Sequence, residues 1–231
     1  MYGLSHKIHP RSRGTRDQGG WTVFITIEGV IGVGKTTVTR LLTESLHGET
    51  LFEIVEENPF LKDFYADRDA WALQTETFFL LNRVKQLEDT AKRLMAGALV
   101  VSDYNVVKNR IFAGLTLTGT KRDKYMQLFH ILTDDLPRAD LVIYLKARHE
   151  TVMDRIKSRG RAFERNMDPE YIRRLAAEYE VYFREPEVHF GPTRVLTVDT
   201  TELDLVGSAT DQQEFRERVD QAMVHTRART A

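Results

Sequence analysis

The segment WTVFITIEGVIGVGKTT, residues 21–37, joins a run of β-branched and aromatic residues to a glycine-rich loop. Residues 21–27 have the composition and the length of a β-strand. The loop that follows fits the pattern G-x-x-x-x-G-K-[ST] in full and leads directly into a helical pattern. Its members are Gly29, Val30, Ile31, Gly32, Val33, Gly34, Lys35 and Thr36, with Thr37 next to them. A strand, this loop and a helix in that order predict a phosphate-binding loop (P-loop) in an α/β protein.

The residue types in this loop determine its chemistry. Glycines allow several backbone N–H groups to converge on phosphate oxygens, and the N-terminus of the next helix adds its partial positive charge. Lys35 is expected to reach the β- and γ-phosphates of a nucleoside triphosphate, and the hydroxyl of Thr36 to bind Mg²⁺. We therefore expect a nucleotide-binding protein. The chain is short for a DNA motor, and it has no N-K-x-D segment of the kind that GTPases use to read guanine.

Composition limits the class of protein further. The 231 residues include 33 Lys and Arg, 34 Asp and Glu, and no Cys, so the net charge is -1. This balance offers no basic footprint for nucleic acid and no polybasic patch for a membrane, and the lack of Cys excludes disulfides and thiolate catalysis. The longest apolar run, residues 141–145, is far shorter than the ~20 residues of a membrane span. We expect a cytoplasmic protein whose partners are small molecules.

Residues 1–20 differ in character from the rest of the chain. They carry Lys7, Arg11, Arg13 and Arg16 against Asp17 alone, and they include four Gly and little that could pack. We interpret them as a flexible leader, a remnant of cloning or the product of an early start codon. The folded domain is expected at residues 21–231.

Beyond the P-loop, short β-rich runs alternate with longer helical patterns. The further predicted strands are residues 51–55, 98–102, 141–145 and 194–198, and the predicted helices are residues 36–47, 69–95, 121–133, 149–158, 167–183 and 210–225. Thr210 and Gln213 resemble a capping box at the start of the last helix. Such alternation predicts one domain with a parallel sheet that helices cover on both faces.

Several segments, taken together, resemble the deoxynucleoside kinase family, and most closely its bacterial deoxyguanosine kinase branch. They are residues 27–37 (IEGVIGVGKTT), 53–65 (EIVEENPFLKDFY), 102–113 (SDYNVVKNRIFA), 132–137 (LTDDLP) and 155–164 (RIKSRGRAFE), with Trp71, Glu76 and Arg83 in the spacing W-x4-E-x6-R. The resemblance implies a P-loop kinase-like, three-layer fold with a five-stranded parallel sheet and an Arg-rich lid. It also implies transfer of the γ-phosphoryl group of ATP, or of another nucleoside triphosphate, to the 5′-hydroxyl of a deoxynucleoside with Mg²⁺. A homodimer is expected, or a heterodimer with a related kinase.

Two carboxylates follow predicted strands and are candidates for the reaction itself. Glu53 resembles the family's base, which accepts the proton of the 5′-hydroxyl, and Glu56 is the alternative in the same loop. Asp103 ends an apolar strand and is expected to bind Mg²⁺ together with Thr36, unless it only caps the next helix.

The chain departs from the family pattern after Asp103. Most members have Asp/Glu-Arg-Ser where this chain has Asp103-Tyr104-Asn105, so the family's bracing arginine is missing. Either Lys108 or a lid arginine replaces it, or this branch does not need it. The lid candidates are Arg155, Arg159 and Arg161, whose guanidinium groups would neutralise the γ-phosphate in the transition state.

The acceptor nucleoside is assigned from helix geometry and from the resemblance. Glu76 and Arg83 are seven residues apart and therefore share a helix face. A carboxylate accepts from guanine N1–H and N2–H₂, and an arginine fork donates to O6 and N7, so the pair favours deoxyguanosine. Deoxyadenosine or mixed purine specificity is the alternative, and a nucleotide sensor that transfers no phosphate is a more distant one. The resemblance further implies that Tyr65 and Glu164 bind the 3′-hydroxyl and, weakly, that Asn109 lies at the base edge.

Overall fold

β1 (Val23–Glu28), the strand before the P-loop, lies in the middle of a five-stranded, all-parallel sheet. The sheet belongs to a computed structural model, which describes residues 22–161, 164 and 167–230. The other strands are β2 (Glu49–Leu51), β3 (Leu99–Ser102), β4 (Leu141–Lys146) and β5 (Arg194–Asp199), in the order β2-β3-β1-β4-β5. The prediction of five parallel strands is therefore confirmed within the described residues.

The central strands are buried on both faces, as expected for a parallel sheet between helices. Ile25 of β1 pairs with Val101 of β3 on one side and with Leu141 of β4 on the other, and all three are at most 1% exposed. This continuous apolar pairing fixes the register, and it brings the ends of β1, β3 and β4 to the same edge of the sheet.

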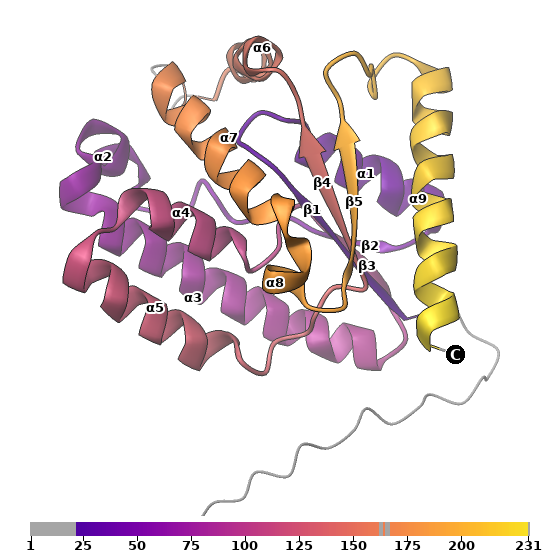
Figure 1. Ribbon diagram of the computed structural model, residues 1–231, viewed down its shortest axis with the longest axis horizontal. Coiled ribbons are helices and arrows are strands. Elements are labelled where there is room, and N and C mark those ends of the chain that lie inside the picture. Colours follow the sequence, from indigo (N-terminus) through magenta and orange to yellow (C-terminus); the bar gives the residue numbers. More distant parts are fainter. Residues whose placement is uncertain (1–21, 162–163, 165–166, 231) are drawn as a thin grey trace, which may run out of the picture.

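Helices on the two faces complete a three-layer fold (Figure 1). α1 (Lys35–Leu46) and α9 (Ala209–Thr230) pack on one face. On the other face lie α3 (Arg68–Met95), α4 (Lys108–Thr116), α5 (Gly119–Thr133) and α7 (Pro169–Arg184). The chain also forms the helices α2 (Leu61–Ala66), α6 (His149–Arg159) and α8 (Pro186–Phe190).

Local signals explain where the longest helices begin. Asp67 caps α3 by accepting a hydrogen bond from the backbone N–H of Ala70, and Asp168 caps α7, which has Pro169 in its first turn. Gly160, in the left-handed region with φ 65°, ends α6 and lets the chain leave the helix, as its place in R-x-x-x-R-G-R predicts.

Some boundaries differ from those predicted. The second strand was expected over residues 51–55, but β2 ends at Leu51 because its partner β3 ends at Ser102 and the backbone N–H of Glu53 turns to the carboxylate of Asp103. The last helix begins at Ala209, and the hydroxyl of Ser208 caps it, so the capping box at Thr210 was wrong. The sequence prediction also missed α2, α4 and α8, which are short. The expected leader, residues 1–20, lies outside the described residues.

The strand order places the candidate site. From β1 the chain first forms β2 and β3 on one side of that strand and then crosses to form β4 and β5 on the other side. Ligands bind outside the carboxyl ends of strands at such a switch point. The P-loop follows β1, Glu53 follows β2, Asp103 follows β3 and Thr200 follows β5, so all four reach this edge.

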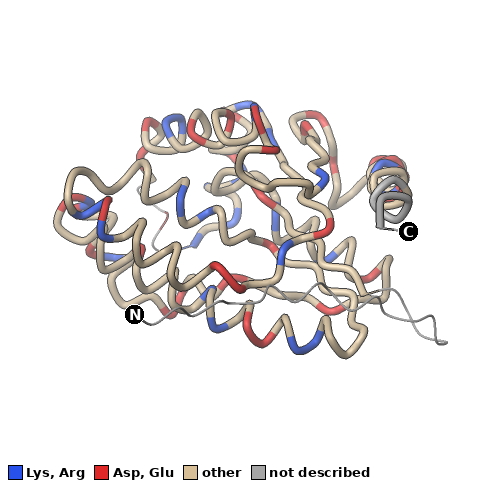
Figure 2. Tube along the Cα trace, turned by 60° about the horizontal axis from the view of Figure 1, so that its bottom comes forward, with Lys and Arg blue, Asp and Glu red and all other residues tan. Residues whose placement is uncertain are grey.

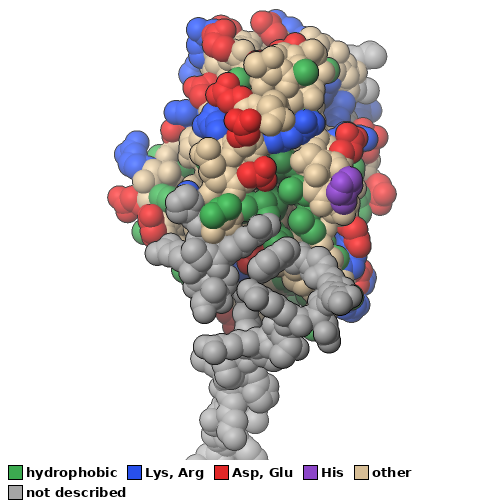
Figure 3. Space-filling view, turned by 90° about the vertical axis from the view of Figure 1, so that its right-hand side faces the viewer, with side chains coloured by type: hydrophobic (Ala, Val, Ile, Leu, Met, Phe, Trp, Pro, Cys, Tyr) green, Lys and Arg blue, Asp and Glu red, His purple; other side chains and the backbone are tan. Residues whose placement is uncertain are grey.

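The surface of the described residues shows mixed charge. Lys and Arg alternate with Asp and Glu along the outer helices (Figure 2). On the face at the α9 side, hydrophobic side chains are visible between charged ones (Figure 3), and Val206 and Val224 are among the exposed apolar residues. None of the described helices is long and apolar enough to cross a lipid bilayer.

Candidate active site

A cavity of about 530 Å³ opens at the carboxyl edge of the sheet, within the usual size range for small-molecule sites. The P-loop forms one end of the cavity, and the candidate residues for binding the acceptor nucleoside form the other. Its walls include most of the residues that the sequence singled out, namely Ile31 to Thr37, Glu53, Tyr65, Glu76, Arg83, Asp103, Arg155, Arg159, Arg161 and Glu164. Side chains from six parts of the sequence therefore meet in one cavity.

The P-loop depends on glycine at positions where the backbone is both crowded and left-handed. Gly29 has φ 142°, and a Cβ there would lie 2.3 Å from the carbonyl oxygen of Leu145. Gly32 has φ 85°, and its Cβ would lie 2.5 Å from Cγ1 of Ile156. Both glycines therefore let the loop pack against β4 and α6.

Lys35 folds back over this loop. Its Nζ donates to the carbonyl oxygens of Gly29 at 2.7 Å and Val30 at 3.0 Å. Burial and the nearby charge of Lys108 lower the pKa of Lys35 to about 7. A bound triphosphate would offer this ammonium group a stronger, charged acceptor and would favour its protonated form.

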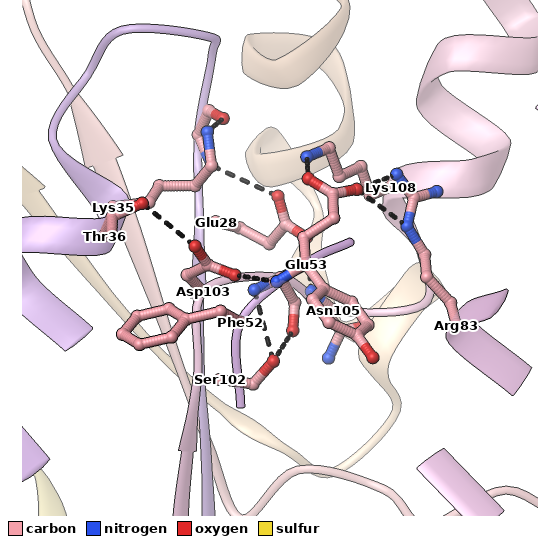
Figure 4. A network of polar contacts seen from close by, with 12 residues as sticks. Glu28, Lys35, Thr36, Phe52, Glu53, Arg83, Ser102, Asp103, Asn105 and Lys108 are labelled. Carbon is pink, nitrogen blue, oxygen red and sulfur yellow. Dashed lines mark hydrogen bonds and ion pairs between the residues drawn. The ribbon is translucent and has the colours of Figure 1, made fainter. Parts of the chain in front are cut away.

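Thr36 and Asp103, the expected Mg²⁺ ligands, are in direct contact. The hydroxyl of Thr36 donates to Oδ2 of Asp103 at 3.0 Å, and Oδ1 of Asp103 accepts from the backbone N–H of Glu53 at 2.8 Å (Figure 4). Burial, and then the charge of Glu53, raise the pKa of the Asp103 carboxyl. A divalent cation held by Thr36 and Asp103 would offset the cost of burying the Asp103 carboxylate. Hydroxyl and carboxylate oxygens are hard ligands of the kind that Mg²⁺ prefers.

Glu53 lies in a buried cluster with two cations. Its Oε1 accepts from Nε of Arg83 at 2.9 Å and also from Nη2, and its Oε2 accepts from Nζ of Lys108 at 2.5 Å (Figure 4). Burial alone would raise the pKa of Glu53, but the two cations outweigh it and hold the pKa well below its usual range. Glu53 is therefore a carboxylate at neutral pH. Glu56, the alternative base, has a side chain that is 74% exposed.

The surroundings of Tyr104 and Lys108 bear on the arginine that is missing from the family pattern. Tyr104, which stands where the family has that arginine, is fully buried and donates through its hydroxyl to Gln86. Lys108 lies four residues further on, at the start of α4, and together with Arg83 it is one of two buried cations that contact the carboxylate of Glu53. Of the replacements that the sequence left open, the geometry supports Lys108.

Glu76 and Arg83 share the buried face of α3, as their spacing predicts. Glu76 is 2% exposed, and its Oε1 accepts from the hydroxyl of Thr116 at 3.1 Å. Burial raises the pKa of Glu76 to about 7. Phe79 and Phe112 line the same part of the cavity and offer flat apolar surfaces. A buried carboxyl beside aromatic rings suits a planar, hydrogen-bonding base.

Two candidates for base recognition differ from their expected geometry. Arg83 uses Nε and Nη2 to hold Glu53, which leaves Nη1, a buried nitrogen without a hydrogen-bond partner among the described residues, for a ligand. Because each terminal nitrogen carries two N–H groups, the edge formed by Nη1 and the second N–H of Nη2 stays available to a ligand while Glu53 is held. Asn109 is fully buried behind the cavity wall and donates to the hydroxyl of Tyr125, and it is not among the residues that line the cavity.

The lid residues also line the cavity, but they are already engaged by protein groups. Arg155 donates to the carbonyl oxygen of Val33 at 3.0 Å and to Thr200, and so ties the P-loop to the end of β5. Arg159 donates to both carboxylate oxygens of Glu164. Arg161 lies 3.9 Å from Glu164 and also 3.9 Å from Glu56. The lid is thus linked to Glu164, the residue expected at the 3′-hydroxyl.

Sequence reasoning missed Glu28, the last residue of β1. Its carboxylate is fully buried and accepts from the backbone N–H groups of Gly29 and Asn105 and from the hydroxyl of Tyr179. It therefore joins the P-loop, the segment after β3 and helix α7. An acidic residue at the end of an otherwise apolar strand was the available signal.

Comparisons with known proteins show the family of the chain. A sequence profile described as deoxynucleoside kinase matches residues 25–225, which is most of the chain. The chain belongs to the deoxynucleoside kinase family. It is 41% identical over 202 residues to deoxyguanosine kinase of Bacillus subtilis (strain 168), across 87% of this chain and 98% of the relative. It is 30% identical over 205 residues to the deoxyadenosine/deoxycytidine kinase of the same strain, across 85% of this chain and 90% of the relative.

Solved structures give the same assignment for the fold. Deoxyadenosine kinase from M. mycoides, solved with products dCMP and a flexible dCDP, superposes with a TM-score of 0.73 at 26% identity, covering 86% of this chain and 99% of that structure. The same enzyme with bound dCTP gives a TM-score of 0.71. As a deoxynucleoside kinase, the chain binds a nucleoside triphosphate and a deoxynucleoside and transfers a phosphoryl group between them.

Proposed function

We propose that this deoxynucleoside kinase acts on deoxyguanosine. The observation that carries the proposal is the carboxyl of Glu76, which is buried in the acceptor half of the cavity between Arg83 and Thr116. As a carboxylate it presents two acceptors to guanine N1–H and N2–H₂, and adenine would leave one of them unpaired at a cost of roughly 1–3 kcal/mol. The similarity to a relative named deoxyguanosine kinase supports the same substrate.

In the proposed reaction, the 5′-oxygen of the nucleoside attacks the γ-phosphorus of ATP or another nucleoside triphosphate. A new bond forms between this oxygen and phosphorus, the bond to the β–γ bridging oxygen breaks, and the 5′-hydroxyl proton passes to Glu53. Arg83 and Lys108 keep Glu53 ionised and fix its orientation. Lys35 and the lid residues Arg159 and Arg161 lie where they can neutralise charge on the phosphoryl oxygens.

The residues present fit a magnesium ion. Thr36 and Asp103 would hold it, and in the described residues no group of three or more His, Cys, Asp or Glu could form a protein-only metal cage. Mg²⁺ is commonly bound in this way, by one or two protein oxygens together with phosphates and water. When bound, it would screen the negative charge of the triphosphate.

Deoxyadenosine or mixed purine specificity is the second candidate. It is favoured by the relatives named deoxyadenosine kinase and by the raised pKa of Glu76, because a protonated carboxyl offers one donor and one acceptor and so matches adenine. A panel of the four common deoxynucleosides with ATP and Mg²⁺, compared by kcat/KM, separates the two. A larger value for deoxyadenosine than for deoxyguanosine would overturn the proposed preference.

The proposal extends to assembly and location. A homodimer, or a heterodimer with a related kinase, in the cytoplasm remains our prediction. Sedimentation of the purified chain at several concentrations tests for the homodimer.

A further inference from the structure

Two hydroxyl groups in the wall of the cavity have no hydrogen-bond partner in the described part of the chain. They are the hydroxyls of Thr75 on α3 and Tyr171 on α7, and each oxygen is shielded from solvent. Thr75 is 1% exposed and Tyr171 is 4% exposed, and both residues line the cavity. Buried polar groups in folded proteins are nearly always paired, so each unpaired one calls for an explanation.

Tyr171 differs in this respect from the other deeply buried tyrosines. Tyr104 bonds to Gln86, Tyr125 to Asn109 and the backbone of Glu76, Tyr144 to Glu180, and Tyr179 to Glu28. The fold therefore supplies partners for buried tyrosine hydroxyls elsewhere. Tyr171, the exception among these five, lines the cavity.

Thr75 differs in the same way from several other threonines inside helices. A buried helical threonine usually donates to the carbonyl oxygen four residues earlier. Thr39, Thr43, Thr90 and Thr133 do so, at 2.8–3.0 Å. Thr75 does not, although it also lies in a helix. Its hydroxyl is therefore available to a ligand in the cavity.

The ring of Tyr171 is held by its neighbours, close to other residues of the cavity wall. The guanidinium of Arg68 lies over its ring, 4.4 Å from the centroid, and the ring of Phe64 packs edge-on at 6.5 Å. These contacts fix the ring. Tyr65 and Glu76 are both close enough to affect its titration, and burial keeps the pKa of Tyr171 well above its usual value, so the group remains a hydroxyl that can donate and accept.

We propose that the hydroxyls of Tyr171 and Thr75 are hydrogen-bonding groups for the bound deoxynucleoside. This inference rests on the proposed function, because it takes the acceptor half of the cavity to be the nucleoside site. Thr75 lies next to Glu76 in the chain, and Tyr171 lies near both Glu76 and Tyr65. Each hydroxyl, which has no partner among the described residues, gains one when the substrate binds.

The test uses Tyr171→Phe and Thr75→Val, which remove the hydroxyls and nearly preserve shape. Tyr144→Phe and Thr90→Val are the matched controls, because those hydroxyls are buried, paired and outside the cavity. The Kd of the preferred deoxynucleoside is measured by titration calorimetry, with KM for ATP and Tm alongside. Loss of one neutral hydrogen bond should raise Kd about three- to tenfold in each cavity variant, leave KM for ATP unchanged and leave Tm unchanged or higher.

The controls should behave in the opposite way, with an unchanged Kd and a lower Tm. A wild-type Kd in both Tyr171→Phe and Thr75→Val would overturn the proposal. A fall in Tm as large as in the controls would also overturn it, because the hydroxyls would then have partners in the protein. Failure of the proposed function is seen separately, as a wild-type chain that prefers another deoxynucleoside or phosphorylates none.

Discussion

The carboxylate of Glu53 and the ammonium group of Lys108 lie 2.5 Å apart, and both side chains are less than 10% exposed. Lys108, on α4, thus holds one carboxylate oxygen of the candidate base. Arg83, on α3, holds the other. A carboxylate held in this way keeps its charge, and its oxygens are directed by fixed partners. This arrangement gives the first predictions.

Substitution Glu53→Gln should lower kcat by roughly 10²- to 10⁴-fold, because the amide preserves the shape but cannot accept the proton. KM for the nucleoside should change little. Glu56→Gln is the matched control, since Glu56 is exposed in the same loop. Loss of activity in Glu56→Gln with normal rates in Glu53→Gln would assign the base to Glu56.

Substitution Lys108→Met should lower kcat at least tenfold, as expected when a fixed charge is removed beside a reacting group. The pKa of Glu53 should rise because one of its two cations is lost, so the acid limb of the kcat–pH profile should move to higher pH. Lys108→Arg should restore part of the rate. A profile that is identical in Lys108→Met and wild type would show that Arg83 alone sets the ionisation of Glu53.

Substitutions Lys35→Ala and Asp103→Ala should each abolish phosphoryl transfer and leave a folded protein, because they remove charge that would contact the triphosphate or its metal. Circular dichroism checks the fold, and product formation checks the transfer. Retention of more than about a tenth of the wild-type kcat by Lys35→Ala, a change of about 1.36 kcal/mol or less, would contradict the role given to the P-loop.

Substitution Glu76→Gln should lower the ratio of kcat/KM for deoxyguanosine over deoxyadenosine by about 10- to 100-fold. The amide replaces one acceptor with a donor, which opposes guanine N1–H and suits adenine N1. Deoxyadenosine phosphorylation should hold or rise. An unchanged ratio in an active variant would place Glu76 outside base recognition.

The same ratio should depend on pH. Because burial raises the pKa of Glu76 to about 7, the carboxyl is protonated below that pH and offers a donor. Above it, the carboxylate offers two acceptors. The preference for deoxyguanosine should therefore increase as the pH rises from about 6 to 8, and it should stay flat in Glu76→Gln. Parallel pH profiles for the two proteins would contradict the assignment.

Features encoded over short stretches of sequence were predicted well. The P-loop was recognisable because its spacing, its lysine and its flanking strand and helix are contiguous, and Glu76 and Arg83 were paired correctly because a helix repeats every 3.6 residues. The end of β2 was misplaced, since it depends on where β3, its neighbour in the sheet, stops. Local patterns do not contain that information.

The residues alone determined the nucleotide-binding α/β class, the P-loop and a set of candidate side chains, because these follow from backbone geometry and from short periodic patterns. Only the tertiary structure decided what those side chains do to one another. Glu28 and Tyr179, which share a hydrogen bond, are 151 positions apart, and Lys108 and Glu53 are 55 apart. Ionisation and hydrogen-bond satisfaction depend on such distant neighbours and on exclusion of water, which appear only when the sheet and its helices have packed.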